Sequence, residues 1–110
     1  MQLTNVRHGN ALVVRISGRL DAVTTPAFEA HCGQALAAGE RNLTLDFAAL
    51  EYISSAGLRG VLTAAKSVAA VDGEFALAGA HGIVQQVLDI SGFLRMFKIV
   101  DALDTPAAQA

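Results

Sequence analysis

Two adjacent serines are the residues best placed to do chemistry in this sequence. Ser54 and Ser55 follow a short apolar stretch and precede a helical pattern that begins near Leu58. The first backbone N–H groups of a helix have no partner within it, and the helix dipole adds partial positive charge at that end. A serine hydroxyl there can cap the helix, and a phosphate bound to it would meet a favourable local field. The pair therefore predicts an N-cap, worth about 1 kcal/mol, a phosphorylation site, or both.

A phosphate at this junction would act mainly on a bound partner. A phosphoserine carries about −1.5 to −2 charges at neutral pH. Inserting that charge into an apolar or acidic interface costs desolvation and repulsion. A penalty of about 2.7 kcal/mol would weaken binding ~100-fold, which is enough for a switch.

Nucleophilic catalysis is a weaker interpretation of the same serines. The elbow of α/β-hydrolases requires Gly-x-Ser-x-Gly, but Ile53 stands two residues before Ser55 and only the following Gly57 fits. A serine nucleophile also needs a base within hydrogen-bond reach. Nothing in the spacing of the three histidines brings them together to act as such a base. They are His8, His31 and His81. We therefore predict no catalytic residue and a protein that is not an enzyme.

The sequence contains no motif that indicates a metal or cofactor site. His31 and Cys32 could supply half of a metal site, but no third or fourth ligand has suitable spacing. Cys32 falls on an apolar helical stripe and is expected to be a small core residue. Neither Gly-x-x-x-x-Gly-Lys-Ser/Thr nor Gly-x-Gly-x-x-Gly occurs. The sequence predicts no metal, nucleotide or other cofactor.

The composition is that of one globular domain over residues 1–110, with 53% hydrophobic and 16% charged residues. A formal net charge of −2 gives no basic field for a phosphate backbone, so nucleic acid is not an expected partner. The sequence has no run of about 18 apolar residues and no leader pattern, which predicts no membrane insertion and a cytoplasmic location. A single cysteine agrees with a reducing compartment.

The first part of the chain predicts a hairpin followed by a helix. Gln2–Arg7 and Ala11–Ile16 are expected to be antiparallel strands joined by a tight turn at residues 8–10. The strand pattern is then broken by Ser17-Gly18-Arg19-Leu20-Asp21. Thr25-Pro26 is a good helix start, because Thr can cap free N–H groups and Pro suits the first turn, and Gly39 is placed to end the helix. The apolar positions of this helix are Phe28, Cys32, Ala35 and Leu36.

Strands and helices alternate in the rest of the chain, which indicates an α/β fold with right-handed crossovers and a largely parallel sheet. The expected strands are Leu43–Phe47, Phe75–Ala78 and Phe97–Val100. The expected helical stripes are Leu58, Val61, Leu62, Ala65 and Val68, and then Ile83, Val84, Val87 and Leu88. Asp72-Gly73-Glu74 and Ser91-Gly92 are expected to end elements, and Asp104-Thr105-Pro106 resembles one more helix start.

Three segments give the chain a resemblance to a known family. They are Ser17-Gly18-Arg19-Leu20-Asp21, Asp46 through Leu58, and Leu88-Asp89-Ile90-Ser91-Gly92-Phe93. Together they resemble a STAS domain of the anti-sigma factor antagonist type, and the likeness covers nearly the whole chain. It implies a single STAS domain with a mixed, mostly parallel sheet of about five strands and helices packed mainly on one face.

The resemblance also implies a partner-switching role. In such systems the unphosphorylated antagonist binds an anti-sigma factor, which is often also its serine kinase with a histidine-kinase-like ATPase fold, and so frees the sigma factor. Phosphorylation dissolves the pair, and a phosphatase would restore the antagonist. Two alternatives stay open: a STAS regulatory subunit of a membrane lipid-transport ABC complex, and a partner switch that controls a non-sigma output.

The resemblance assigns roles to individual residues. Ser55 aligns with the phosphoacceptor and Ser54 is a minor candidate, although the family often has Asp where Ser54 stands and Ser where Ala56 stands. Asp21 aligns with an acidic residue near the acceptor. It would orient the Ser55 hydroxyl or take part in kinase recognition, or else be a turn aspartate that caps the first helix by accepting from nearby N–H groups.

The predicted partner-binding surface consists of Asp21, Ser54, Ser55, Gly57 and Arg59. Gly57 is expected to allow close approach of a partner or of a neighbouring element, since Gly inside a helix otherwise costs up to ~1 kcal/mol. Arg59 would border the surface. Lys66 is expected to lie on a solvated helix face, and Asp46 to serve as a structural acceptor at the end of a strand.

Overall fold

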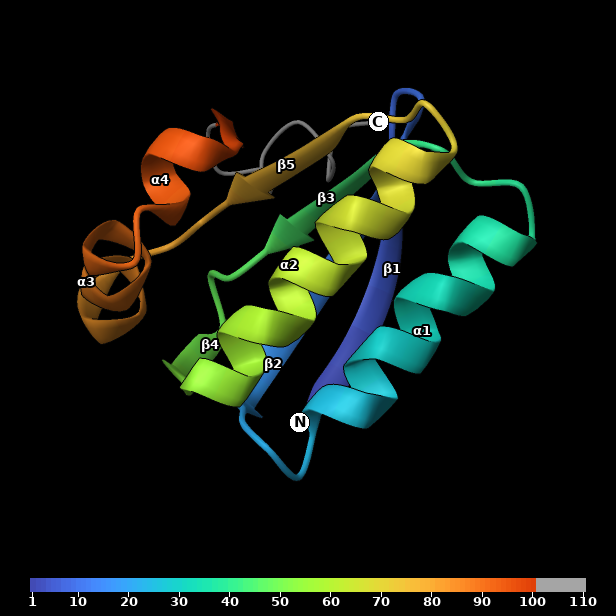
Figure 1. The fold of residues 1–110 in the computed structure, drawn as a ribbon. Coiled ribbons are helices and arrows are strands. Elements are labelled where there is room, and N and C mark those ends of the chain that lie inside the picture. The colour runs from blue at the N-terminus through green and yellow to red at the C-terminus, as the bar shows by residue number, and fades with distance from the viewer. Residues whose placement is uncertain (101–110) are drawn as a thin grey trace.

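The structure, a computed structural model, describes residues 1–100 as a six-stranded sheet with four helices (Figure 1). This confirms the predicted α/β class with a mixed, mostly parallel sheet. The strands are β1 (Gln2–His8), β2 (Ala11–Leu20), β3 (Leu43–Asp46), β4 (Leu50–Ile53), β5 (Phe75–Ala78) and β6 (Lys98–Val100). The helices are α1 (Thr25–Ala37), α2 (Ser55–Ala70), α3 (Gly82–Ile90) and α4 (Phe93–Met96). The helix start expected at Asp104-Thr105-Pro106 lies outside the described residues.

The sheet is organised around β2. Its order is β1-β2-β3-β5-β6, with β4 beside β2 and off this path. Only the β1–β2 pair is antiparallel, and the other pairs are parallel. The 10 residues of β2 pair first with β3, from Leu12 to Arg15, and then with β4, from Gly18 to Leu20. One strand thus holds two parallel neighbours in succession.

The prediction that the second strand ends at Ile16 is wrong. The strand continues to Leu20 because β4 supplies partners for its last residues. The register shifts between Gly18 and Arg19, and Gly18 takes a φ of +91°, a left-handed conformation that Gly adopts at little cost. The sequence Ser17-Gly18 therefore marks an irregularity inside the strand.

Two short elements, β4 and α4, are absent from the sequence prediction. In β4 only the end residues Leu50 and Ile53 are buried, so the strand lacks the alternation that predicts a half-buried strand. In α4 the four residues are too few to show a helical repeat, and Phe93 alone is buried. β4 depends on pairing with the distant β2, and α4 on burial of Phe93 in the core.

Two helices lie side by side on one face of the sheet, α1 and α2, as Figure 1 shows. The other two, α3 and α4, lie together at one end of the sheet, where α3 packs beside β4. The predicted placement of helices mainly on one face is confirmed. The core between helices and sheet contains Val14, Ile16, Leu20, Phe28, Leu43, Leu45, Phe47, Val61, Val68, Leu77 and Leu88, all fully buried or nearly so.

Within residues 1–100, no helix covers the opposite face of the sheet (Figure 1). It carries a small apolar cluster in which Val13 and Ala78 are buried and Val6 and Val100 pack against them. Among the same residues, no helix is both long enough and apolar enough to cross a membrane.

The start of α1 differs from its prediction. Thr24, not Thr25, is the N-cap residue, while Pro26 lies in the first turn as expected. The Thr25 side chain is buried, and its hydroxyl has no hydrogen-bond partner among the described residues. Thr25 instead packs against α2, where a Cβ built at Gly60 would lie 2.6 Å from the Thr25 Cγ2. The two helices approach closely at this point.

This contact predicts opposite effects for two Gly→Ala substitutions. Gly60→Ala should destabilise the protein by about 1–3 kcal/mol, because the new methyl group overpacks the α1–α2 contact. Gly33→Ala in α1 is the matched control, since a Cβ there meets nothing within 4 Å. It should stabilise by about 0.5–1 kcal/mol through helix propensity. Urea unfolding followed by circular dichroism measures both, and equal effects would contradict the close approach.

Candidate functional site

Two connections leave the sheet side by side at the carboxyl ends of β2 and β4. Leu20 and Ile53 are register partners in this parallel pair. The Ser54 backbone N–H donates to the Leu20 carbonyl over 3.0 Å. Asp21 and Ser55 each follow one of these bonded residues, so the two lie at the same edge of the sheet.

Ser54 is the N-cap of α2. Its backbone is extended, with φ −97° and ψ 175°, and its Oγ accepts a hydrogen bond from the Gly57 N–H over 3.2 Å. Its carbonyl accepts from the Leu58 N–H over 2.8 Å. The half-buried Ser54 side chain is therefore engaged in the helix start, which confirms capping by one member of the serine pair.

Ser55 is the first residue of α2 and is exposed. The Gly57 and Leu58 N–H groups are bonded to Ser54, so the Ser55 side chain is not needed to cap the helix. A phosphate on its Oγ would lie at the positive end of a 16-residue helix. The structure thus separates a capping serine from a neighbouring serine that faces solvent.

Asp21 organises the turn before α1. Its Oδ1 accepts hydrogen bonds from the backbone N–H groups of Val23, over 3.0 Å, and Thr24, over 3.1 Å. Its own N–H donates to the Thr24 Oγ1 over 2.9 Å, and Arg19 lies 3.7 Å from its Oδ2. These bonds, led by that from Thr24, hold the pKa of Asp21 below its ordinary value of 3.8. Asp21 is thus a turn aspartate, as predicted, but its side chain accepts from N–H groups that precede α1, so the expected cap on this helix is not seen. A role toward Ser55 or a kinase stays a prediction.

Gly57 allows the close approach of a neighbouring element. A Cβ at this position would lie 2.5 Å from the Leu20 carbonyl oxygen and 2.9 Å from Ile53 Cγ1. Gly57 is buried, so it brings the first turn of α2 onto the end of β2 and supports the surface from beneath. Arg59 is exposed and lies one turn after Ser55, and Lys66 is exposed farther along α2.

Asp46 is the structural acceptor that the sequence predicts. It is buried, its Oδ1 accepts from the Ala48 N–H over 3.0 Å, and its Oδ2 accepts from Arg15 Nε over 3.2 Å. The Ala48 carbonyl in turn lies 2.8 Å from His81 Nε2. These contacts fix the short loop between β3 and β4, and so the position of the strand that leads to the serine pair.

Comparison with known proteins identifies the family. The sequence model of the STAS domain matches residues 2–105. The chain belongs to the STAS domain family. BtrV of Bordetella bronchiseptica, which is named as an anti-sigma factor antagonist, is 36% identical over 108 residues, 98% of this chain and 93% of BtrV. The family resemblance drawn from the sequence is confirmed.

Two solved structures show the same fold. A Thermotoga maritima protein described as an anti-sigma factor antagonist has a TM-score of 0.84 at 20% identity, over 97% of this chain and 92% of that one. The Bacillus cell fate determinant SpoIIAA in its phosphorylated form has a TM-score of 0.73 at 26% identity, over 98% and 96% of the two chains. By sequence and structure, this STAS domain falls among the anti-sigma factor antagonists.

The surface of this STAS domain near Ser55 contains residues that the sequence analysis missed. Val23, in the Asp21 turn, is 86% exposed, and the Arg19 guanidinium lies over the Tyr52 ring, 4.2 Å from its centroid. Arg19 and Tyr52 are register partners in β2 and β4. Because β4 was not predicted, nothing in the sequence placed Tyr52 beside Arg19. The only signal in the sequence for this apolar surface was a valine, Val23, in a turn next to Asp21.

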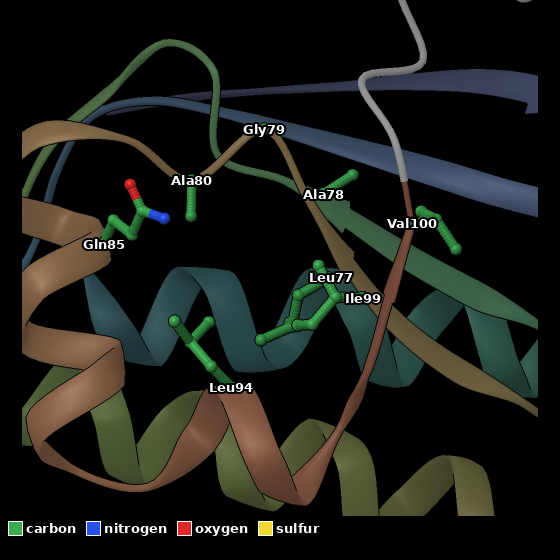
Figure 2. Close-up of a pocket in the computed structure, with 8 residues that line it drawn as sticks. All are labelled: Leu77, Ala78, Gly79, Ala80, Gln85, Leu94, Ile99 and Val100. Carbon is green, nitrogen blue, oxygen red and sulfur yellow. The ribbon is translucent and has the colours of Figure 1, made fainter.

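A cavity lies elsewhere, between β5, β6, α3 and α4 (Figure 2). Its volume is about 350 Å³. Figure 2 shows Leu77, Leu94 and Ile99 around it, and among residues 1–100 Gln85 is the only polar side chain that lines it. None of the residues predicted to bind a partner contributes to this cavity. Because residues 1–100 offer one amide and no charged group to orient a ligand there, we assign it no function.

The cysteine and the histidines do not form a site. Burial raises the pKa of the Cys32 thiol to about 12, and the side chain packs in the core, as predicted. His31 Nε2 lies 2.7 Å from Asn5 Oδ1, so this ring links α1 to β1. Within residues 1–100, no group of three or more His, Cys, Asp or Glu side chains could hold a metal ion.

The two serines should differ in their effect on stability. Ser54→Ala removes the hydroxyl that accepts from Gly57 and should lower the free energy of unfolding by about 1 kcal/mol. Ser55→Ala is the matched control, because its side chain caps nothing, and should change stability by less than about 0.5 kcal/mol. Thermal and urea unfolding of both variants test this. A larger loss from Ser55→Ala would contradict the assignment of the cap.

The hydrogen bonds of Asp21 predict a dependence of stability on pH. Its folded-state pKa is lowered, so its ionised form stabilises the fold above the ordinary value of 3.8, and this contribution is lost as pH falls through the lowered pKa. Asp21→Asn keeps an acceptor oxygen but not the charge. The wild type should be more stable than this variant at about pH 6, and the difference should shrink as the pH falls below 3.8. Urea midpoints measured across this range give the result, and a constant difference would contradict it.

Proposed function

We propose that this STAS domain is a non-enzymatic, phosphorylation-controlled antagonist in a partner-switching system. In its unphosphorylated form it binds an anti-sigma factor that is also a serine kinase, and thereby releases a sigma factor in the cytoplasm. The observation that carries the proposal is that the two adjacent serines have different surroundings. Ser54 holds the helix start, while Ser55 is exposed beside it and free of a structural task.

The surface around Ser55 has the features of a docking site for a protein. Val23 and Tyr52 offer apolar area, and Arg19, Asp21 and Arg59 surround it with charge. The Asp21 turn is held by hydrogen bonds from Val23 and Thr24, and the start of α2 is held by Ser54. Because both segments are fixed before binding, little conformational entropy is lost when a partner docks.

Phosphorylation of Ser55 would control this surface without altering the fold. The phosphate would remain exposed, at the positive end of α2, where the helix tolerates it. A partner that covers Ser55 would instead have to bury about −1.5 to −2 charges against its own surface. The kinase adds this charge, and a phosphatase would remove it to restore binding. SpoIIAA, whose phosphorylated form shares this fold, supports the proposal.

The experiment that tests this function uses the serine kinase of histidine-kinase-like fold encoded nearest to this chain. After incubation with that kinase and ATP, mass spectrometry should find one phosphate on Ser55, absent from Ser55→Ala and retained in Ser54→Ala. Calorimetric titration should show binding to the unphosphorylated chain and affinity weakened ~100-fold by phosphorylation.

Other outcomes would redirect the assignment. Binding without modification would indicate a constitutive antagonist. Phosphate on Ser54 alone would contradict the choice of acceptor. No binding to the kinase, together with co-purification with a membrane ATPase, would favour a transporter subunit instead.

A further inference from the structure

Helix α2 carries positive charge on its exposed side. Residues 55–70 include Arg59 and Lys66 but no Asp or Glu, and both cations are exposed. The whole chain has a formal net charge of −2, so this helix differs in sign from the molecule to which it belongs. A partner that docks on the start of α2 would meet local positive charge, which suits an acidic surface.

Arg59 is the cation of α2 that lies one helical turn after Ser55. Residues four apart on a helix are neighbours, with Cβ atoms about 5–6 Å apart. Long side chains on a helix also tend to lean toward its N-terminus, so the Arg59 side chain can extend over the turn that begins with Ser55. An arginine fork can hold a phosphate through two parallel hydrogen bonds.

Arg59 has no acidic partner among residues 1–100. The ion pairs in this part of the chain join Arg7 to Glu40, Arg15 to Asp46 and Arg19 to Asp21. One carboxylate of the adjacent helix faces this region: Glu29 Oε2 would lie 3.6 Å from a Cβ built at Gly60. Glu29 forms no ion pair with Arg59 in the structure. As far as residues 1–100 are concerned, the guanidinium is therefore available to a new anion.

We propose that Arg59 has a different partner in each state of the switch. In the unphosphorylated chain it binds a carboxylate on an acidic surface of the docked protein. In the phosphorylated chain it is held by the phosphate on Ser55, so the docked protein loses a contact as well as meeting repulsion. The inference rests on the proposed phosphorylation of Ser55.

The change in net charge at the start of α2 supports both effects of the phosphate, the lost contact and the repulsion. In the unphosphorylated chain, Ser55 and Arg59 together carry about +1 charge. A phosphate of about −1.5 to −2 changes this to about −0.5 to −1, so the local sign inverts. An acidic surface that was attracted to the start of α2 is then repelled by it.

The intramolecular contact can be tested without any partner. Phosphoserine is incorporated at position 55 during translation, and the phosphate is titrated by phosphorus NMR. Its second pKa, ordinarily near 6, should be lower in the chain with Arg59 than in Arg59→Gln by about 0.3–0.6 units. Lys66→Gln, on the same helix but farther from Ser55, should give no difference. Equal titration in all three chains would overturn the capture of the phosphate by Arg59.

The contact with the partner is tested with the same kinase and unphosphorylated chains. Arg59→Gln should weaken binding about 5–10-fold and Arg59→Glu more, while Lys66→Gln should change it less than about 2-fold. The affinity of the wild type should also fall more steeply with added salt than that of Arg59→Gln. Unchanged affinity in both Arg59 variants would overturn the acidic contact.

The two proposals fail in different ways. If phosphorylation of Ser55 weakens binding while the Arg59 variants behave as wild type in both assays, only the role of Arg59 is wrong. If the kinase never modifies Ser55 but Arg59→Glu abolishes binding, the acidic contact stands and phosphorylation control is wrong.

Discussion

The end of β2 is the constraint on which the rest of the site depends. The Leu20 carbonyl accepts the Ser54 N–H, and Gly57 must lack a side chain to let α2 approach that same oxygen. This single junction sets the direction of α2 and the place where the Asp21 turn begins. It exists because β2 runs past β3 and takes β4 as a second parallel neighbour. The surface around Ser55 is thus built on sheet pairing, not on a flexible loop.

A surface fixed in this way favours control by charge over control by change of shape. The Asp21 turn is closed by its own hydrogen bonds, and the helix start is closed by Ser54. A group added to Ser55 meets solvent and the positive end of α2, and no buried contact has to break to admit it. The free energy of the switch would then reside in the interface, where desolvation and repulsion are largest.

The sequence predicted the helices and strands that have local patterns. It did not predict those whose existence or length depends on pairing between distant segments. The bounds of β5 are as predicted, and Gly39 follows the end of α1 as expected, because apolar periodicity and turn residues define them. The extension of β2 to Leu20 and the existence of β4 depend on each other and on neither segment alone. For the same reason Ser55 could be singled out from its neighbours in sequence, whereas the stacking of Arg19 on Tyr52 could not.

The position of Ser55 in the first turn of a packed helix also limits which enzymes could modify it. A hydroxyl in an extended segment can be drawn into an active site by local rearrangement. Here the preceding residue, Ser54, donates its N–H to the Leu20 carbonyl and accepts the Gly57 N–H with its side chain. A kinase acting on Ser55 would have to fit the intact domain, so substrate choice would follow from shape more than from flanking residues. Departures from the usual family sequence at Ser54 and Ala56 are then tolerable. An unfolded or truncated chain would escape modification, and the phosphate would mark only molecules that have completed folding.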